Sequence, residues 1–242
     1  MLMEEKMGWI IAGIILLVAL AYPLYRFYIF LLFHRRSAKP IPGKIHIACV
    51  GDSITFGAGV LKTQKTESYP AYLQELLGDG YQTINYGLTG RTLLQSGDLQ
   101  YIREKLYPVT FQTKPDIYII MLGTNDAKRY FWDEEAYRTE MKAFLQRYIS
   151  EAGNDHVIVM KPPRVFIAEG QTEEMFDIRN RNVQCTLGIL ENLAAEQAVH
   201  VIDLYQLTEN HPGWFTDGVH PTAEGNKRIA EHIFGEMKQF GL

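Results

Sequence analysis

Residues 45–60 read IHIACVGDSITFGAGV, an apolar run that ends at a glycine and is followed at once by an acid and a serine. The run Ile45–Val50 is short, rich in Val and Ile, and lacks a clean alternation of apolar and polar positions. Such a run is typical of a strand buried on both faces of a parallel sheet. We therefore expect a strand that delivers Asp52 and Ser53 to the carboxyl edge of the sheet, where reactive groups gather in such folds.

Similar apolar runs recur along the chain, and longer segments with helical patterning separate them. The predicted strands are Ile45–Val50, Thr83–Tyr86, Ile117–Leu122, His156–Met160 and Val199–Leu204, and the predicted helices are Tyr69–Leu77, Asp98–Leu106, Asp133–Ala152, Glu173–Ala198 and Ala223–Phe240. Asp133, Thr172 and Thr222 are the expected N-caps of the last three helices. Strand–helix alternation predicts a three-layer α/β/α sandwich around a central, mostly parallel sheet.

The N-terminal segment has a different character. Residues Gly8–Tyr25, GWIIAGIILLVALAYPLY, carry no charge and are almost wholly apolar. A helix needs roughly 20 such residues to cross a bilayer, so we expect a transmembrane helix before the sandwich. A cleaved signal peptide is the alternative, because Ala19-Leu20-Ala21 resembles a cleavage site, but Glu4 and Glu5 stand where a signal peptide has a positive excess.

The predicted domain organisation follows from this segment: residues 1–36 form a membrane anchor, residues 37–43 a linker, and residues 44–242 one globular domain. The protein is thus expected at a membrane as a single-pass protein. The positive charges that follow the span would place the domain in the cytoplasm. A surface-polysaccharide esterase would need the opposite side, and the side stays open.

Composition excludes several functions. The formal net charge is −4 and no basic stripe runs through the domain, so nucleic acid is not an expected partner. Cys49 and Cys185, the two cysteines, are expected to be small buried hydrophobic residues rather than a disulfide framework. No CxxC or HExxH motif and no cluster of His and Cys occurs, so we expect neither a metal nor a cofactor.

Two segments carry a nucleophile and a base. A serine hydroxyl such as that of Ser53 is a weak nucleophile until a base takes its proton, although Ser53 could instead cap the following turn. Residues 215–225, FTDGVHPTAEG, place Asp217 three residues before His220. This spacing can bring the carboxylate to the imidazole and leave the other ring nitrogen as the base. A surface acid beside a capping histidine is the alternative.

Two further segments offer hydrogen-bond donors. In NYGLTGRTLL, residues 85–94, Gly87 closes a predicted strand and Gly90 follows three residues later; a glycine there lets the backbone N–H approach a substrate oxygen, or simply forms a turn. In IIMLGTNDAK, residues 119–128, the Asn125 amide can donate to a developing oxyanion or form an Asx-turn. Asp126 is expected to brace or cap its loop rather than to do chemistry.

Together and in this order, the four segments closely resemble the SGNH hydrolases, also called GDSL esterases and lipases. The resemblance runs from about Ile45 to Ile233, nearly the whole of the predicted domain, residues 44–242. The family's eponymous leucine is Ile54 here, a volume-conserving change.

The resemblance implies a role for each candidate. Ser53 is the nucleophile, His220 the general base and then the general acid, and Asp217 orients the imidazole. The oxyanion hole consists of the backbone N–H groups of Ser53 and Gly87 and the side-chain amide of Asn125. The implied enzyme is a carboxylic ester hydrolase that works through an acyl-enzyme and needs no metal and no other cofactor.

The substrate is less well defined. The pattern LGTNDAK…DGVHP is similar to family members that remove acetyl groups from carbohydrates, so we expect an ester of small acyl chain, with O-acetyl on a carbohydrate favoured. The candidate substrate-binding residues are Arg91, Tyr130, Trp132, Arg164 and Trp214. The alternatives are a lysophospholipase or short-chain lipase and, from another class, a non-catalytic glycan-binding module on the same fold.

Overall fold

A computed structural model describes residues 19–25 and 38–242 of the chain. Its contacts divide the chain into two units, Met1–Arg36 and Ser37–Leu242, and residues 19–25 of the first unit are helical. Within the described residues, no helix has the length and apolar character needed to cross a bilayer. Most of the predicted membrane anchor, residues 1–18 and 26–36, lies outside the described residues.

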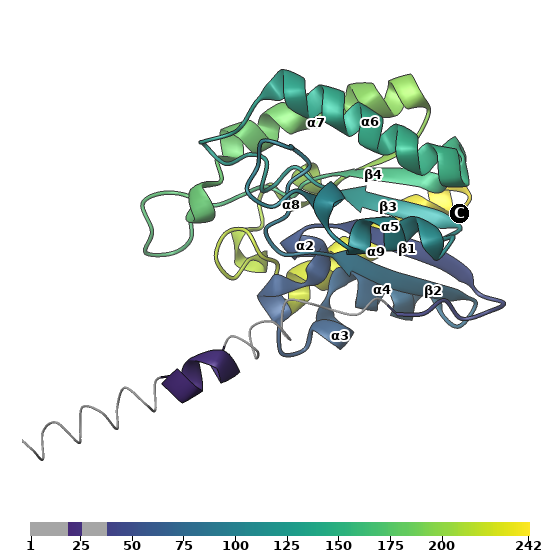
Figure 1. The fold of residues 1–242 in the computed structure, drawn as a ribbon, viewed down its shortest axis with the longest axis horizontal. Coiled ribbons are helices and arrows are strands. Elements are labelled where there is room, and N and C mark those ends of the chain that lie inside the picture. Colours follow the sequence, from purple (N-terminus) through teal and green to yellow (C-terminus); the bar gives the residue numbers. More distant parts are fainter. Residues whose placement is uncertain (1–18, 26–37) are drawn as a thin grey trace, which may run out of the picture. The chain divides into compact units, whose positions relative to one another are not determined.

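The second unit is built around one parallel sheet (Figure 1). Its strands are β1 (Ile45–Gly51), β2 (Tyr81–Gly87), β3 (Ile117–Met121), β4 (Val157–Lys161) and β5 (His200–Asp203). They follow the order β2-β1-β3-β4-β5, and all four pairings are parallel. This is the flavodoxin-like order, in which the chain changes direction between β1 and β3. Each predicted strand is confirmed, with its ends shifted by two residues at most.

The register of the sheet brings the predicted functional segments to one edge. Gly51 at the end of β1 pairs with Gly87 of β2 on one side and with Met121 of β3 on the other. The residues that follow these three strands therefore leave the sheet side by side. Ligands bind at such a switch point in open α/β sheets, and here it carries Ser53 and Asn125.

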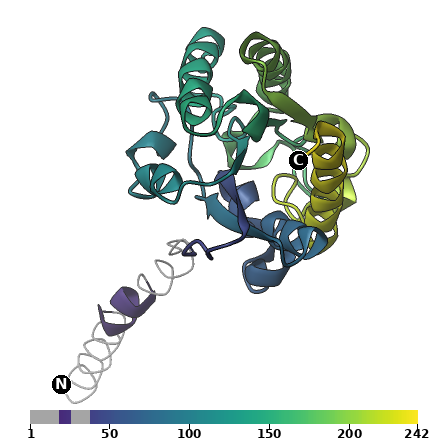
Figure 2. The same cartoon turned by 90° about the vertical axis from the view of Figure 1, so that its right-hand side faces the viewer.

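Helices cover both faces of the sheet. The α-helices are α2 (Ser53–Phe56), α3 (Gln64–Glu67), α4 (Tyr69–Leu77), α5 (Leu106–Gln112), α6 (Glu134–Ala152), α7 (Asn180–Gln197), α8 (Leu204–Thr208) and α9 (Ala223–Phe240). Short 3₁₀ helices span Ala58–Val60, Tyr101–Arg103, Asn154–His156, Met175–Asp177 and Pro212–Trp214. Figure 2 shows the long helices α6 and α7 on one side of the sheet and α4 and α9 on the other.

The alternation of side chains along β1 explains the two cores. Ala48 and Val50 point into the cluster beneath α6 and α7, whereas Ile47 and Cys49 point into the cluster beneath α4 and α9. Both faces of the strand are buried, as the lack of polar alternation predicted. The predicted α/β/α sandwich with its parallel sheet is therefore confirmed.

Local capping explains where the predicted helix ends are right. Helices α4 and α9 have the predicted bounds, and Thr222 caps α9 by accepting the Gly225 N–H through its hydroxyl at 3.1 Å. Asp133 caps α6 by accepting the Ala136 N–H at 2.9 Å. A side chain that satisfies an otherwise unpaired N–H in the first turn marks a helix start.

Two helix predictions are wrong. The segment Asp98–Leu106 holds only the short 3₁₀ turn Tyr101–Arg103, and the helix begins at Leu106 instead of ending there. Its first turn contains Pro108, which is tolerated there because the N–H it lacks would have no helical partner.

The helix predicted from Glu173 begins only at Asn180, so Thr172 is not its N-cap. Phe176 and Asp177 have φ angles of 60° and 57°, which a right-handed helix cannot contain. The expected burial of Cys185 is also wrong, because Cys185 lies on the exposed face of α7. Cys49 is buried, and desolvation raises the pKa of its thiol to about 12.

Candidate active site

Three of the predicted residues meet at the carboxyl edge of the sheet. The Ser53 Oγ lies 2.9 Å from His220 Nε2, and His220 Nδ1 lies 2.6 Å from the Asp217 Oδ2. The Asp217 carboxylate accepts a hydrogen bond from the His220 Nδ1–H. This leaves Nε2 unprotonated, so that it can take the proton of the Ser53 hydroxyl. The Ser53 residue is buried, with 4% of its surface exposed. The structure thus brings the nucleophile, the base and the orienting acid into one chain of hydrogen bonds.

Ser53 owes its position to the turn at the end of β1. It is the first residue of α2, and the N-cap of this helix is Asp52, whose Oδ1 accepts the Ile54 N–H at 2.9 Å. The first N–H groups of a helix have no partner within the helix. Within residues 38–242 the Ser53 N–H makes no hydrogen bond. The residue that carries the nucleophile therefore also has a backbone donor available.

The loop before α9 is shaped by Asp217. Its Oδ1 accepts the backbone N–H groups of Val219 at 3.0 Å and His220 at 2.8 Å, while its Oδ2 faces the His220 ring. Burial alone would raise the pKa of Asp217, but the hydrogen bonds and charge of His220 outweigh it and hold this pKa below its ordinary value. Asp217 is therefore held as an ionised acceptor that fixes the tautomer of His220.

Asn125 lies beside the nucleophile turn. Its Nδ2 donates to Asp52 Oδ2 at 3.3 Å and to the Arg91 carbonyl at 3.2 Å. These contacts link the amide to the turn after β1, which contains Asp52, and to the loop after β2, which contains Arg91. Both contacts lie at or just beyond the long end of the usual N–H···O range, so the amide can turn a hydrogen towards a developing oxyanion.

The assignment of Gly87 to the oxyanion hole is wrong. The Gly87 N–H already donates to Asn85 Oδ1 at 2.9 Å. A Cβ at this position would collide with backbone atoms of Thr55 and Phe56, so the residue is the contact that seats α2 on β2. A glycine is needed at position 87 because the backbones of β2 and α2 are in contact there, and contact with the substrate is not the reason.

Gly90 takes the place of Gly87 as the candidate donor. It lies in a left-handed turn with φ 77°, and its N–H makes no hydrogen bond within the described part of the chain. The neighbouring Arg91 carbonyl is the acceptor for Asn125, so the Gly90 turn lies next to the amide. The nearest atom to a Cβ built there is Leu99 Cδ1 at 3.5 Å, so little covers this turn. Of the two glycines in NYGLTGR, Gly90 is therefore the better candidate for an oxyanion donor.

Two fully buried carboxyl groups underlie the site. Burial raises the pKa of Asp52 to about 6 and that of Asp126 to about 7. Asp126 Oδ1 accepts the Leu94 N–H at 2.7 Å, whereas its Oδ2 is buried without a hydrogen-bond partner. Asp126 thus braces the loop after β2, as expected, and holds it against the loop that carries Asn125.

A protein-family model described as the GDSL-like Lipase/Acylhydrolase family matches residues 49–228 of the chain. The chain belongs to this family. The match covers both the nucleophile turn and the segment that carries Asp217 and His220. The predicted resemblance to the SGNH, or GDSL, hydrolases is confirmed, and the predicted class, carboxylic ester hydrolase, is that of the family.

Individual esterases are similar to this GDSL protein at modest identity. An acetylxylan esterase from Xylanibacter ruminicola is 31% identical over 216 residues, which cover 82% of this chain and 44% of that protein, so the chain spans less than half of this relative's length. A carbohydrate acetylesterase from Sinorhizobium meliloti has a TM-score of 0.65 at 24% identity, covering 81% of this chain and 99% of that one. The aryl esterase of M. smegmatis has a TM-score of 0.65 at 22% identity, covering 84% and 100%. These two structures share the fold.

Four of the five predicted substrate-binding side chains of this GDSL protein contact residues other than the catalytic ones. The Arg91 guanidinium pairs with Glu104 at 2.7 Å, and Arg164 lies 3.7 Å from Glu209. Trp132 packs against Tyr137 at a ring-centroid distance of 5.4 Å, and Trp214 stacks on His211 at 3.9 Å. Arg91 touches the site through its carbonyl alone, and the others reach no catalytic side chain within the described residues.

Tyr130 and an unpredicted residue, Phe176, remain open to solvent. Tyr130 is 66% exposed, and its hydroxyl donates to the Asp177 carboxylate. Phe176 is 48% exposed, and its ring meets the His220 ring edge-on with 5.4 Å between centroids. A single phenylalanine in a polar loop gave no signal in the sequence, because only the folded loop brings it to His220.

Proposed function

We propose that this protein is a serine esterase that hydrolyses esters of small acyl chain through an acyl-enzyme, with O-acetyl groups on carbohydrate as its natural substrate. The observation that carries the proposal is the hydrogen-bond chain from Ser53 through His220 to Asp217. The acetylxylan esterase similarity supports the choice of acyl group and acceptor. Ser53, His220 and Asp217 then act as nucleophile, base and orienting acid.

The reaction follows from this geometry. The Ser53 Oγ attacks the ester carbonyl carbon while His220 Nε2 accepts the hydroxyl proton. The carbonyl oxygen becomes an oxyanion that accepts hydrogen bonds from the N–H groups of Ser53 and Gly90 and from the Asn125 amide. The tetrahedral intermediate collapses, and the alcohol leaves with the proton that His220 returns. Water then attacks the acyl-enzyme by the same route and releases the acid.

An ester series tests the reaction and its chain-length preference. The full chain is incubated with p-nitrophenyl esters of two, four, eight and sixteen carbons, and Ser53→Ala serves as the control. We expect turnover of the acetate by the wild type, labelling of Ser53 by a serine-reactive phosphonate, and neither in the variant. Preference for eight carbons or more would favour the lysophospholipase or short-chain lipase. Absence of both turnover and labelling would leave the glycan-binding module.

We propose further that residues 1–36 anchor the protein to a membrane as a single-pass segment. The uncharged, apolar run Gly8–Tyr25 supports this, as does its length relative to the roughly 20 residues of a membrane span. The full chain should sediment with membranes and resist carbonate extraction. Release by carbonate would argue against the anchor, and protease protection of the domain in sealed vesicles would reveal its side.

A further inference from the structure

Phe176 has an unusual backbone conformation for its side chain. Its φ and ψ are 60° and 23°, and the next residue, Asp177, has φ 57°. Large side chains rarely adopt this left-handed region, which glycine and asparagine occupy more readily. Strain of this kind persists only where the surroundings hold it, and it is concentrated at functional sites. The ring gains little burial in return, because Phe176 is 48% exposed.

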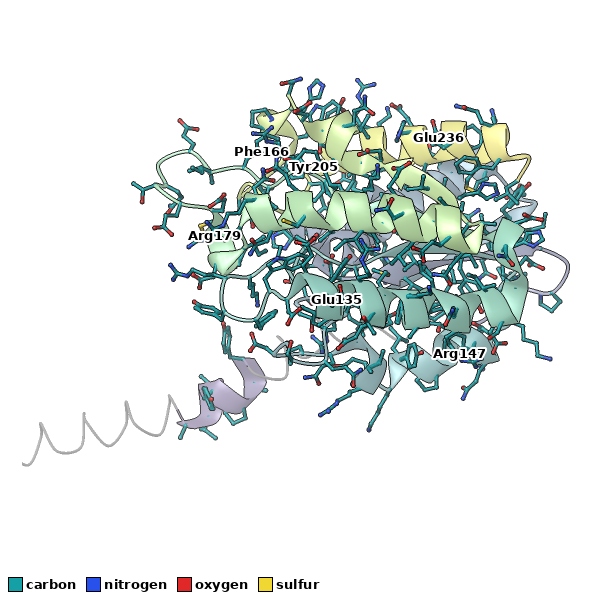
Figure 3. All side chains as sticks on the ribbon, turned by 90° about the horizontal axis from the view of Figure 1, so that it is seen from above. Glu135, Arg147, Phe166, Arg179, Tyr205 and Glu236 are labelled. Atoms are coloured by element: carbon teal, nitrogen blue, oxygen red, sulfur yellow. The ribbon has the colours of Figure 1, made fainter. Side chains whose placement is uncertain are left out.

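The surroundings that hold Phe176 belong to the loop after β3. The Arg129 N–H donates to the Asp177 carbonyl at 3.1 Å, and the Arg179 N–H donates to the Ala127 carbonyl at 3.0 Å. The Tyr130 hydroxyl donates to the Asp177 carboxylate. Arg179, labelled at the start of α7 in Figure 3, also pairs with acids of the strained segment's own loop. The segment is therefore fixed to the loop that carries Asn125.

The ring lies at the histidine of the catalytic triad. Its centroid is 5.4 Å from that of the His220 ring, with 65° between the planes. In ester hydrolysis His220 Nε2 gives its proton to the departing alcohol, whereas the acyl carbonyl turns towards the oxyanion donors at Ser53 and Asn125. A residue in contact with the imidazole therefore borders the alcohol side of the ester rather than the acyl side.

The segments that hold Phe176 carry polar and charged side chains, and these favour a polyhydroxylated alcohol. The Tyr130 hydroxyl, the Asp177 carboxylate and the Arg129 guanidinium all lie on the segments that hold Phe176. A sugar ring has an apolar C–H face that can rest on an aromatic ring and hydroxyl groups that can bond to charged side chains. An alkyl chain would instead leave these charged groups against hydrocarbon, which is costly.

We propose that Phe176 is a specificity-determining residue whose exposed ring forms a platform for the pyranose ring of the departing sugar. The proposal rests on the esterase function proposed above and adds the place where the sugar binds. The backbone strain is explained by the same role, because the left-handed turn presents the ring beside His220 instead of folding it into the core.

Substrates that share the acetyl group but differ in the alcohol test this platform. The measured quantity is the ratio of kcat/KM on an acetylated xylo-oligosaccharide to kcat/KM on ethyl acetate. Phe176→Asn should lower this ratio about tenfold, mainly through KM on the oligosaccharide, as expected for loss of an aromatic contact and its apolar area. Phe176→Trp, which keeps an aromatic ring at this position, should leave the ratio near its wild-type value. The control Leu76→Ala, an exposed apolar residue on α4, should leave the ratio unchanged.

Stability separates recognition from misfolding. Asparagine accepts the left-handed conformation, so Phe176→Asn should melt at the wild-type temperature or about 2–4 °C above it. An unchanged ratio in Phe176→Asn overturns the platform while leaving the esterase intact. A loss that instead follows acyl length, from methyl acetate to methyl octanoate, would move Phe176 to the acyl side and overturns it too. Failure of the wild type on every ester overturns the esterase and the platform together.

Discussion

The side-chain amide of Asn125 is the one proposed oxyanion donor that a substitution can remove, because the other two are backbone N–H groups of Ser53 and Gly90. Its two contacts, to Asp52 and the Arg91 carbonyl, hold it beside Ser53 without engaging it strongly. Asn125→Ala should lower kcat about 100-fold or more, since one oxyanion donor contributes about 2.7–4 kcal/mol. Turnover of p-nitrophenyl acetate measures the effect. Undiminished kcat in a folded variant would remove Asn125 from the oxyanion hole.

Asp217→Asn should damage the reaction through the tautomer of His220. The backbone N–H groups of Val219 and His220 both need an acceptor at the Oδ1 position, so the carbonyl of an asparagine would occupy it. The amide NH₂ would then face His220 Nδ1 and favour the proton on Nε2, where it cannot accept from Ser53. We expect kcat to fall by roughly 10³–10⁴. Near-normal turnover, with an unchanged melting temperature, would show that Asp217 does not set the tautomer.

Local spacing explains which site residues could be predicted. Asp217 and His220 are three residues apart, and Ser53 directly follows an apolar strand. Each of these signals lies within one short segment of the sequence. The role of the Gly90 N–H and the position of Phe176 were not predicted, for a different reason. Whether a backbone N–H is free, or which ring meets the histidine, depends on packing between segments that are distant in the sequence.

Secondary structure shows the same division. Helix α9 was predicted with its observed ends because Thr222 caps it locally and Gly241 ends it in a left-handed conformation. The start of α7 was wrong because long-range contacts decide it: Asp177 and Arg179 bond to the loop after β3, which holds the preceding turn out of the helix. Propensity and capping patterns do not carry that information.

The contact between α2 and β2 provides a test of the corrected glycine roles. Gly87→Ala places a Cβ against backbone atoms of Thr55 and Phe56, which cannot move aside as a side chain would. Overpacking of this kind costs about 1–3 kcal/mol or more. Gly90→Ala meets no such obstacle and incurs only the cost of its left-handed φ, about 1–2 kcal/mol.

Gly87→Ala should therefore lower the melting temperature further than Gly90→Ala, as measured by calorimetry on both variants. Because α2 carries Ser53, Gly87→Ala should also reduce labelling of the serine. Equal melting temperatures in the two variants would contradict a packing role for Gly87.

The parallel sheet and its two helical layers follow from a property of the whole chain. The central strands β1, β3 and β4 are largely buried on both faces, so helices must cover both sides of the sheet, and the two clusters that alternate along β1 show that they do. The order of the strands could not be read in the same way, because it depends on which runs pair across the sheet. The buried acids are a second global feature, since Asp52 and Asp126 are placed under the site at a cost to the stability of the entire domain.

That cost depends on pH. The pKa of Asp126 is about 7 in the folded protein against 3.8 for an ordinary aspartate, so between these values the folded state holds a proton that the unfolded chain has released. The contribution of Asp126 to the free energy of unfolding must then fall as pH rises from about 4 to 7. A displacement of this size corresponds to roughly 4 kcal/mol at most.

Asp126→Asn removes the titrating group and keeps an oxygen to accept the Leu94 N–H. Its stability relative to the wild type should therefore increase between pH 4 and pH 8, whatever the offset at pH 4, where both side chains are neutral in the folded state. Urea unfolding at pH 4, 6 and 8 measures the difference, and Asp155→Asn, on the 3₁₀ turn before β4, provides a control at an exposed acid. A constant difference across this range would mean that Asp126 is not protonated in the folded protein, and that its charge is stabilised by groups other than the Leu94 N–H.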